Sequence, residues 1–92
     1  MSPTATRELT IQNVRGLHAR AAAKFCTTAA AFDAEITVTK DETSVGGTSL
    51  MALLMLGAGL GSTITISAEG PEAETAVGAL AALVDNRFDE PS

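Results

Sequence analysis

The sequence is poor in the residues that would support a disulfide, a metal site or a cysteine enzyme. It contains one cysteine, Cys26, and one histidine, His18. A single cysteine cannot form an internal disulfide, and one histidine with one cysteine excludes a clustered His/Cys metal site. Eight helical residues span about 12 Å, so Cys26 lies too far along the chain to form a catalytic pair with His18. We expect no bound metal and no cofactor.

Positive charge is also scarce, with six basic and eleven acidic residues and a net charge of −5. A nucleic-acid-binding protein needs a basic patch to neutralise phosphates, so we expect no nucleic-acid partner. Arg7, Arg15, Arg20 and Lys24 nevertheless all lie in the first 24 residues. This clustering indicates either a basic neighbourhood around His18 or an ordinary solvated surface.

Long apolar runs are absent. The uncharged stretch 45–68 contains a continuous apolar run only over residues 50–56, far short of the roughly 20 residues that a membrane span requires. The N-terminus lacks the basic start and apolar run of a signal peptide. We therefore expect a cytoplasmic protein without membrane association. Residues 1–92 are expected to form a single domain, in which 1–5 and 88–92 are loose tails.

Hydrophobic periodicity predicts seven elements in the order β-α-β-β-α-β-α. Strands with one polar face favour an antiparallel sheet, and amphipathic helices must bury one side against it. The expected fold class is α+β: a two-layer sandwich in which a four-stranded antiparallel sheet is covered on one side by three helices. Alternation of polar and apolar residues predicts strands at 7–12, 34–39, 43–47 and 63–68. Helical spacing and capping signals predict helices at 18–31, 50–56 and 72–86.

His18 lies where the loop containing Gly16 is expected to enter the first helix. Free backbone N–H groups and the positive helix end make such a place suitable for phosphate. An imidazole can act as the nucleophile, and the Arg20 guanidinium can pair with phosphoryl oxygens. Phosphoryl transfer needs mainly positioning and charge stabilisation. The other interpretation is that a lone histidine is an ordinary surface or capping residue.

The segment 16–22, GLHARAA, resembles the active-site segment of the HPr family, the histidine phosphocarriers of the bacterial phosphotransferase system. The similarity covers nearly the whole chain. Three further segments match the second strand, the second helix and the entry to the third helix: 32–36, 49–57 and 68–71. Three stretches are more similar to NPr, the nitrogen-related branch, than to sugar-transport HPr: 32–35, 52–56 and 88–90.

The resemblance implies an HPr-like open-faced sandwich and a carrier that is not an enzyme. His18 would be phosphorylated at Nδ1 by an Enzyme I-type donor and would pass the group to an IIA-type acceptor, while Arg20 steadies it. Ser49 would match a serine that a kinase phosphorylates in some members. A monomer suits a carrier that presents one face to successive partners. The implied docking residues are Ala19, Lys24, Leu50, Met51 and Leu54.

Other interpretations of these residues stay open. Ser49 can simply cap the second helix, and the apolar docking residues can belong to the core, with Met51 expected to be the more exposed. Ala21 departs from the family, because most members have proline there, so the histidine loop is expected to be less rigid. The alternative functions are a regulatory binding module controlled at Ser49 and an unrelated small α+β interaction domain.

Overall fold

The computed structural model describes residues 3–92. Its four strands form one antiparallel sheet in the order β1-β4-β2-β3. The element order β-α-β-β-α-β-α agrees with the prediction from the sequence. The elements are β1 Thr4–Thr10, α1 Ala19–Ala30, β2 Glu35–Lys40, β3 Thr43–Gly46, α2 Leu50–Met55, β4 Thr63–Glu69, α3 Ala73–Asp85 and a 3-10 turn, η1, Arg87–Asp89.

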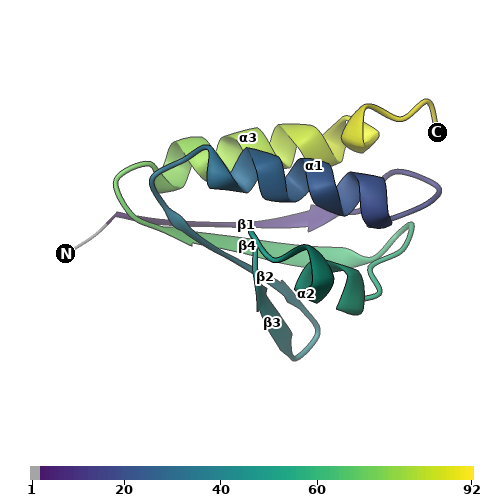
Figure 1. Ribbon diagram of the computed structural model, residues 1–92, viewed down its shortest axis with the longest axis horizontal. Helices are drawn as coiled ribbons and strands as arrows, with labels where there is room; N and C mark the ends of the chain where they lie inside the picture. The colour runs from purple at the N-terminus through teal and green to yellow at the C-terminus, as the bar shows by residue number, and fades with distance from the viewer. Residues whose placement is uncertain (1–2) are drawn as a thin grey trace.

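The molecule has two layers. Helices α1 and α3 lie side by side across one face of the sheet, and the short α2 packs against α1 and β3 (Figure 1). This arrangement confirms the expected α+β sandwich. Within residues 3–92, the structure contains no helix long and apolar enough to cross a membrane.

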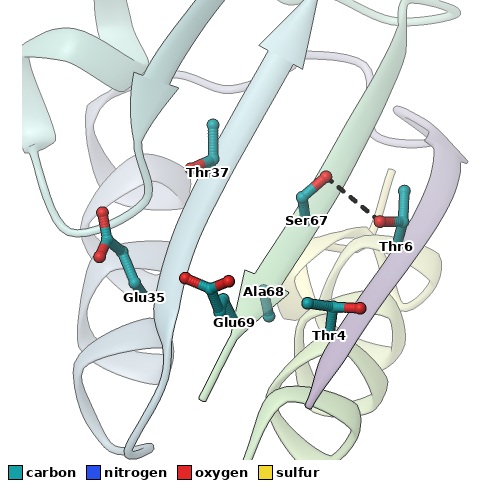
Figure 2. Close-up of a pocket in the computed structure, with 7 residues that line it drawn as sticks. All are labelled: Thr4, Thr6, Glu35, Thr37, Ser67, Ala68 and Glu69. Carbon is teal, nitrogen blue, oxygen red and sulfur yellow. Dashed lines mark hydrogen bonds between the residues drawn. The ribbon is translucent and has the colours of Figure 1, made fainter. Parts of the chain in front are cut away.

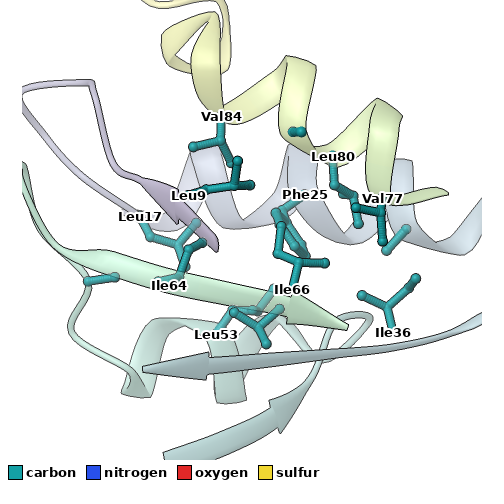
Figure 3. Packing of buried hydrophobic residues seen from close by; sticks show 14 of the residues in the cluster. Leu9, Leu17, Phe25, Ile36, Leu53, Ile64, Ile66, Val77, Leu80 and Val84 are labelled. Atoms are coloured by element: carbon teal, nitrogen blue, oxygen red, sulfur yellow. The ribbon is translucent and has the colours of Figure 1, made fainter. Parts of the chain in front are cut away.

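The core lies between the sheet and the helices (Figure 3). Strand residues point alternately to the two faces, so Ile36 and Val38 of β2 and Ile64 and Ile66 of β4 all turn toward the helices and are buried. Phe25 of α1 fills the space above them and is fully buried. Burying a side chain of this size contributes about 1.5–3 kcal/mol, which helps to hold α1 against the sheet.

The opposite face of the sheet is open and polar. A hollow of about 320 Å³ on this face is lined largely by hydroxyl groups and two glutamates (Figure 2). Thr6 donates a hydrogen bond to Ser67 there (3.4 Å), and Glu35 lies opposite Glu69 in the strand register. No histidine and no cation lines this hollow, so it lacks the groups that phosphoryl transfer requires.

The termini differ from the prediction. Strand β1 already begins at Thr4, because Ala5 pairs with Ala68 of β4; residues 1 and 2 of the predicted N-terminal tail lie outside the described residues. The prediction of a loose C-terminal tail is wrong at Phe88, whose side chain is fully buried. The apolar ring inserts into the core, and this holds η1 against the end of α3.

Candidate functional site

His18 is the N-cap residue of α1, so the helix begins at Ala19, one residue later than predicted. Its backbone is extended (φ −80°, ψ −178°), and its carbonyl accepts a hydrogen bond from the Ala22 N–H at 2.8 Å. The first N–H groups of a helix have no acceptor within the helix, and the His18 side chain forms no capping hydrogen bond to them. The N–H groups of Ala19, Arg20 and Ala21 therefore form a positive helix end beside the imidazole.

The loop before His18 rests on the loop between α2 and β4. The Leu17 N–H donates to the Ala58 carbonyl at 2.8 Å, and the Leu17 side chain is buried. Gly16 has a positive φ of 66°, and a Cβ there would lie 2.7 Å from the Ala58 oxygen. Only glycine fits both the backbone angle and the close approach. This contact between two loops fixes where α1 begins.

The C-terminal segment supplies the closest side-chain partner of His18. Figure 1 shows this segment at the same end of the molecule as the loop that leads into α1. The Glu90 carboxylate contacts Nε2 of His18 and accepts a second hydrogen bond from the Asn13 side chain at 2.9 Å. The side chains of His18 and Glu90 are only 15% and 12% exposed. Within residues 3–92 the structure gives Nδ1 of His18 no hydrogen-bond partner.

Hydrogen bonds hold Glu90 in its charged form. The Asn13 amide makes the largest contribution to lowering the carboxyl pKa, followed by His18, and the positive charge of Arg15 adds to the effect. A carboxylate with a lowered pKa favours folding above its ordinary titration range, and this contribution is lost as the pH falls through the lowered pKa. Glu90 is therefore ionised beside His18 at neutral pH.

Two cations follow His18 on α1, and they differ in what they contact. Arg20 is exposed and forms no ion pair within residues 3–92. Lys24 donates to the Phe88 carbonyl at 2.9 Å and lies 3.5 Å from the Asp89 carboxylate. The Arg20 guanidinium is thus available to an incoming anion, whereas the Lys24 ammonium, expected at the docking surface, holds the C-terminal segment.

The second helix presents an apolar surface to solvent. Met51 is 69% exposed and Leu50 is 41% exposed, which confirms Met51 as the more accessible of the two. Leu54 is half-buried, and Met55, which the sequence analysis missed, is 80% exposed. Its signal was the spacing of four residues from Met51, which places both on one helix face. We call Leu50, Met51 and Met55 the apolar patch.

Ser49 caps α2, as its position before a run of helix formers predicts. Its hydroxyl accepts a hydrogen bond from the Ala52 N–H at 3.3 Å, and the residue is exposed. Ala19, another expected docking residue, is also exposed at the start of α1. Cys26 is half-buried, and burial raises the pKa of its thiol. The described part of the chain, residues 3–92, contains no cluster of three His, Cys, Asp or Glu side chains that could hold a metal ion.

Comparisons with known proteins point to a single family. The family model described as the PTS HPr component phosphorylation site matches residues 5–86. The chain is 49% identical to phosphocarrier protein NPr of Shewanella violacea, with 94% of each chain covered. It is 43% identical to phosphocarrier protein HPr of Cupriavidus necator, covering 91% of this chain and 94% of that protein.

A solved structure has the same fold. The crystal structure of HPr-C-His from Thermoanaerobacter tengcongensis superposes with a TM-score of 0.92 at 39% identity, covering 96% of this chain and 99% of the other. The family match, the relatives and the fold extend over nearly the whole sequence. The chain therefore belongs to the HPr family of phosphocarrier proteins.

Proposed function

We propose that the protein accepts a phosphoryl group on Nδ1 of His18 from an Enzyme I-type donor that uses phosphoenolpyruvate, and passes it to an IIA-type acceptor. The observation that carries this proposal is the position of the imidazole at the N-terminus of α1, with Nε2 engaged by Glu90. Nδ1 is then the ring nitrogen left to react. The expected setting is the cytoplasm, and the expected state is a monomer.

The transfer needs a nucleophile and groups that stabilise the negative charge of the phosphoryl oxygens. The Nδ1 lone pair attacks phosphorus while the bond to the donor breaks in line with it, and the reverse exchange discharges the group to the acceptor. The N–H groups at the start of α1 stabilise the negative phosphoryl oxygens. The exposed Arg20 guanidinium adds charged hydrogen bonds of planar geometry.

We assign the relay to the nitrogen-related branch. The identity to NPr of Shewanella violacea extends over 94% of both chains and supports this assignment. Both partners would dock on the apolar patch of Leu50, Met51 and Met55, together with Leu54 and Ala19, because exposed apolar side chains gathered on one face are typical of protein interfaces.

Intact-mass spectrometry tests the proposal. The protein is incubated with phosphoenolpyruvate and Enzyme I proteins from both branches, and the rate of mass gain is compared. The expected result is one phosphoryl group that is lost in acid and that the nitrogen-related donor adds faster. No mass gain with any competent donor would contradict the carrier role. An acid-stable phosphate on Ser49, added by a serine kinase, would then favour the regulatory alternative.

Replacing Arg20 should slow the transfer. Hydrogen bonds to charged groups contribute about 1.5–3 kcal/mol, so Arg20→Ala is expected to reduce the charging rate about 10- to 100-fold. Arg7→Ala, which removes a guanidinium from β1, is the matched control and should charge normally. Intact-mass measurements on samples taken at successive times of the charging reaction give both rates. Equal rates for the two variants would show that Arg20 does not contact the phosphoryl group.

A further inference from the structure

The contact between Glu90 and His18 joins residues 72 positions apart in the sequence. The carboxylate has two oxygens, and each has its own partner. Oε2 contacts Nε2 of His18, and Oε1 accepts from Nδ2 of Asn13 at 2.9 Å. Because the carboxylate is anchored at both oxygens, it faces the imidazole in one orientation.

Asn13 connects this carboxylate to the histidine loop. Its side chain is fully buried, and Nδ2 also donates to the Gly16 carbonyl at 2.8 Å. A buried amide is costly unless it is hydrogen-bonded, so these contacts hold the loop and Glu90 together. Oδ1 of Asn13 has no hydrogen-bond partner within residues 3–92. The Asn13 side chain thus holds both the loop before His18 and the Glu90 carboxylate that contacts the imidazole.

An unusual backbone turn brings Glu90 back to the site. Arg87, Phe88 and Asp89 all have left-handed backbone angles, with φ of 56°, 53° and 65°. Non-glycine residues adopt this region rarely, and several in succession need surrounding contacts to hold them. Those contacts are the buried Phe88 ring, the Lys24 hydrogen bond to the Phe88 carbonyl, and a 2.7 Å hydrogen bond from Asn86 to Asp89.

We propose that Glu90 is a positioning residue for phosphoryl transfer, which holds His18 in the Nε2–H tautomer and stabilises the charged ring that forms when Nδ1 is phosphorylated. The inference rests on the proposed function of His18. The hydrogen bond made by one ring nitrogen sets which tautomer is present. A carboxylate behind a reacting imidazole also stabilises the cationic ring.

The electron count fits this role. The Nδ1 lone pair forms the new N–P bond, and the bond between phosphorus and the donor breaks with its electron pair left on the donor. The proton on Nε2 stays where it is, so the ring becomes a phosphorylated imidazolium. The Glu90 carboxylate faces that positive ring. The positive charge of Arg15 also lowers the pKa of the Glu90 carboxyl group. The lowered pKa of Glu90 keeps this charge in place at neutral pH.

Two variants and one matched control test the proposal. Glu90→Gln keeps the shape but removes the charge, and Glu90→Ala removes both charge and hydrogen bonds. Glu74→Gln makes the same chemical change at the first turn of α3. Nitrogen-15 NMR of the His18 ring reports the tautomer in the unphosphorylated protein, and intact mass reports the charging rate with Enzyme I. Thermal unfolding verifies that each variant folds.

The wild type and Glu74→Gln should show the Nε2–H tautomer and equal charging rates. Glu90→Gln should charge about tenfold more slowly, the effect of losing one charged hydrogen bond, and Glu90→Ala should be slower still with a mixed tautomer. Wild-type rates and an unchanged tautomer in both variants would overturn the inference. If the wild type itself gains no phosphoryl group, the proposed function fails, and the positioning role fails with it even where the NMR shows the Nε2–H tautomer.

Discussion

A His18→Ala variant is expected to accept no phosphoryl group while it keeps the fold of the parent protein. His18 is the sole histidine of the chain, so no second imidazole can substitute for it. The extended backbone at this position suits alanine, and the histidine side chain makes no capping hydrogen bond that the helix would lose. Removal of the Glu90 contact leaves Asn13 on the same carboxylate. We expect unfolding free energy to change by about 1 kcal/mol or less.

Intact mass after incubation with Enzyme I and phosphoenolpyruvate measures this loss. Ser49→Ala is the control, because it removes the other candidate phosphorylation site while the charging of His18 should continue at the parental rate. Urea unfolding of both variants shows whether the loss is chemical or due to unfolding. Parental charging of His18→Ala would place the acceptor elsewhere, and a Ser49→Ala variant without phosphate would then identify it as Ser49.

Phe88→Ala is expected to have the largest effect on stability. The Phe88 ring is fully buried, and truncation of a buried phenylalanine costs about 3–5 kcal/mol. Domains of this kind are stable by about 5–15 kcal/mol in total, so this loss is a large share. The left-handed turn around residue 88 would also lose its anchor, and Glu90 would leave His18. Slower charging should therefore accompany the lower stability.

Urea unfolding, followed by circular dichroism, measures the change in unfolding free energy. Phe32→Ala is the matched control, since Phe32 packs against the edge of the same core but is only half-buried. It should cost clearly less than Phe88→Ala and leave the charging rate near that of the parent. If Phe88→Ala lowers the unfolding free energy less than Phe32→Ala does, the Phe88 ring does not anchor the C-terminal turn on the core.

The sheet and the helices could be predicted because their signals are local. Alternation over residues 34–39 predicts β2, which spans Glu35–Lys40. On α1, four residues of the sequence recur at helical spacing, and three of them, Ala22, Phe25 and Ala29, are buried. The fourth, Cys26, is only half-buried, while Ala21 is fully buried. The face that a helix buries depends on the elements that pack against it. Periodicity alone therefore does not determine how the helix is rotated about its axis.

The environment of His18 could be predicted only in part. The sequence placed His18 and Arg20 correctly at the start of a helix, because capping positions are local. It missed Asn13 and Glu90, whose roles depend on a C-terminal turn that returns to the first loop. That turn needs left-handed angles at three residues with side chains, and no glycine marks it. Long-range packing of Phe88 decides its conformation, and no local pattern predicts such packing.

The contact of Gly16 with the loop between α2 and β4 has a consequence for conformational entropy. Ordering a flexible loop costs about 1–2 kcal/mol per residue, and a carrier with a mobile histidine loop would meet this cost with the donor and again with the acceptor. Here the Leu17 hydrogen bond to Ala58 and the close approach at Gly16 order the loop when the chain folds. In the proposed relay, the donor and the acceptor would therefore meet the same imidazole geometry, and neither association would have to restrict the loop further.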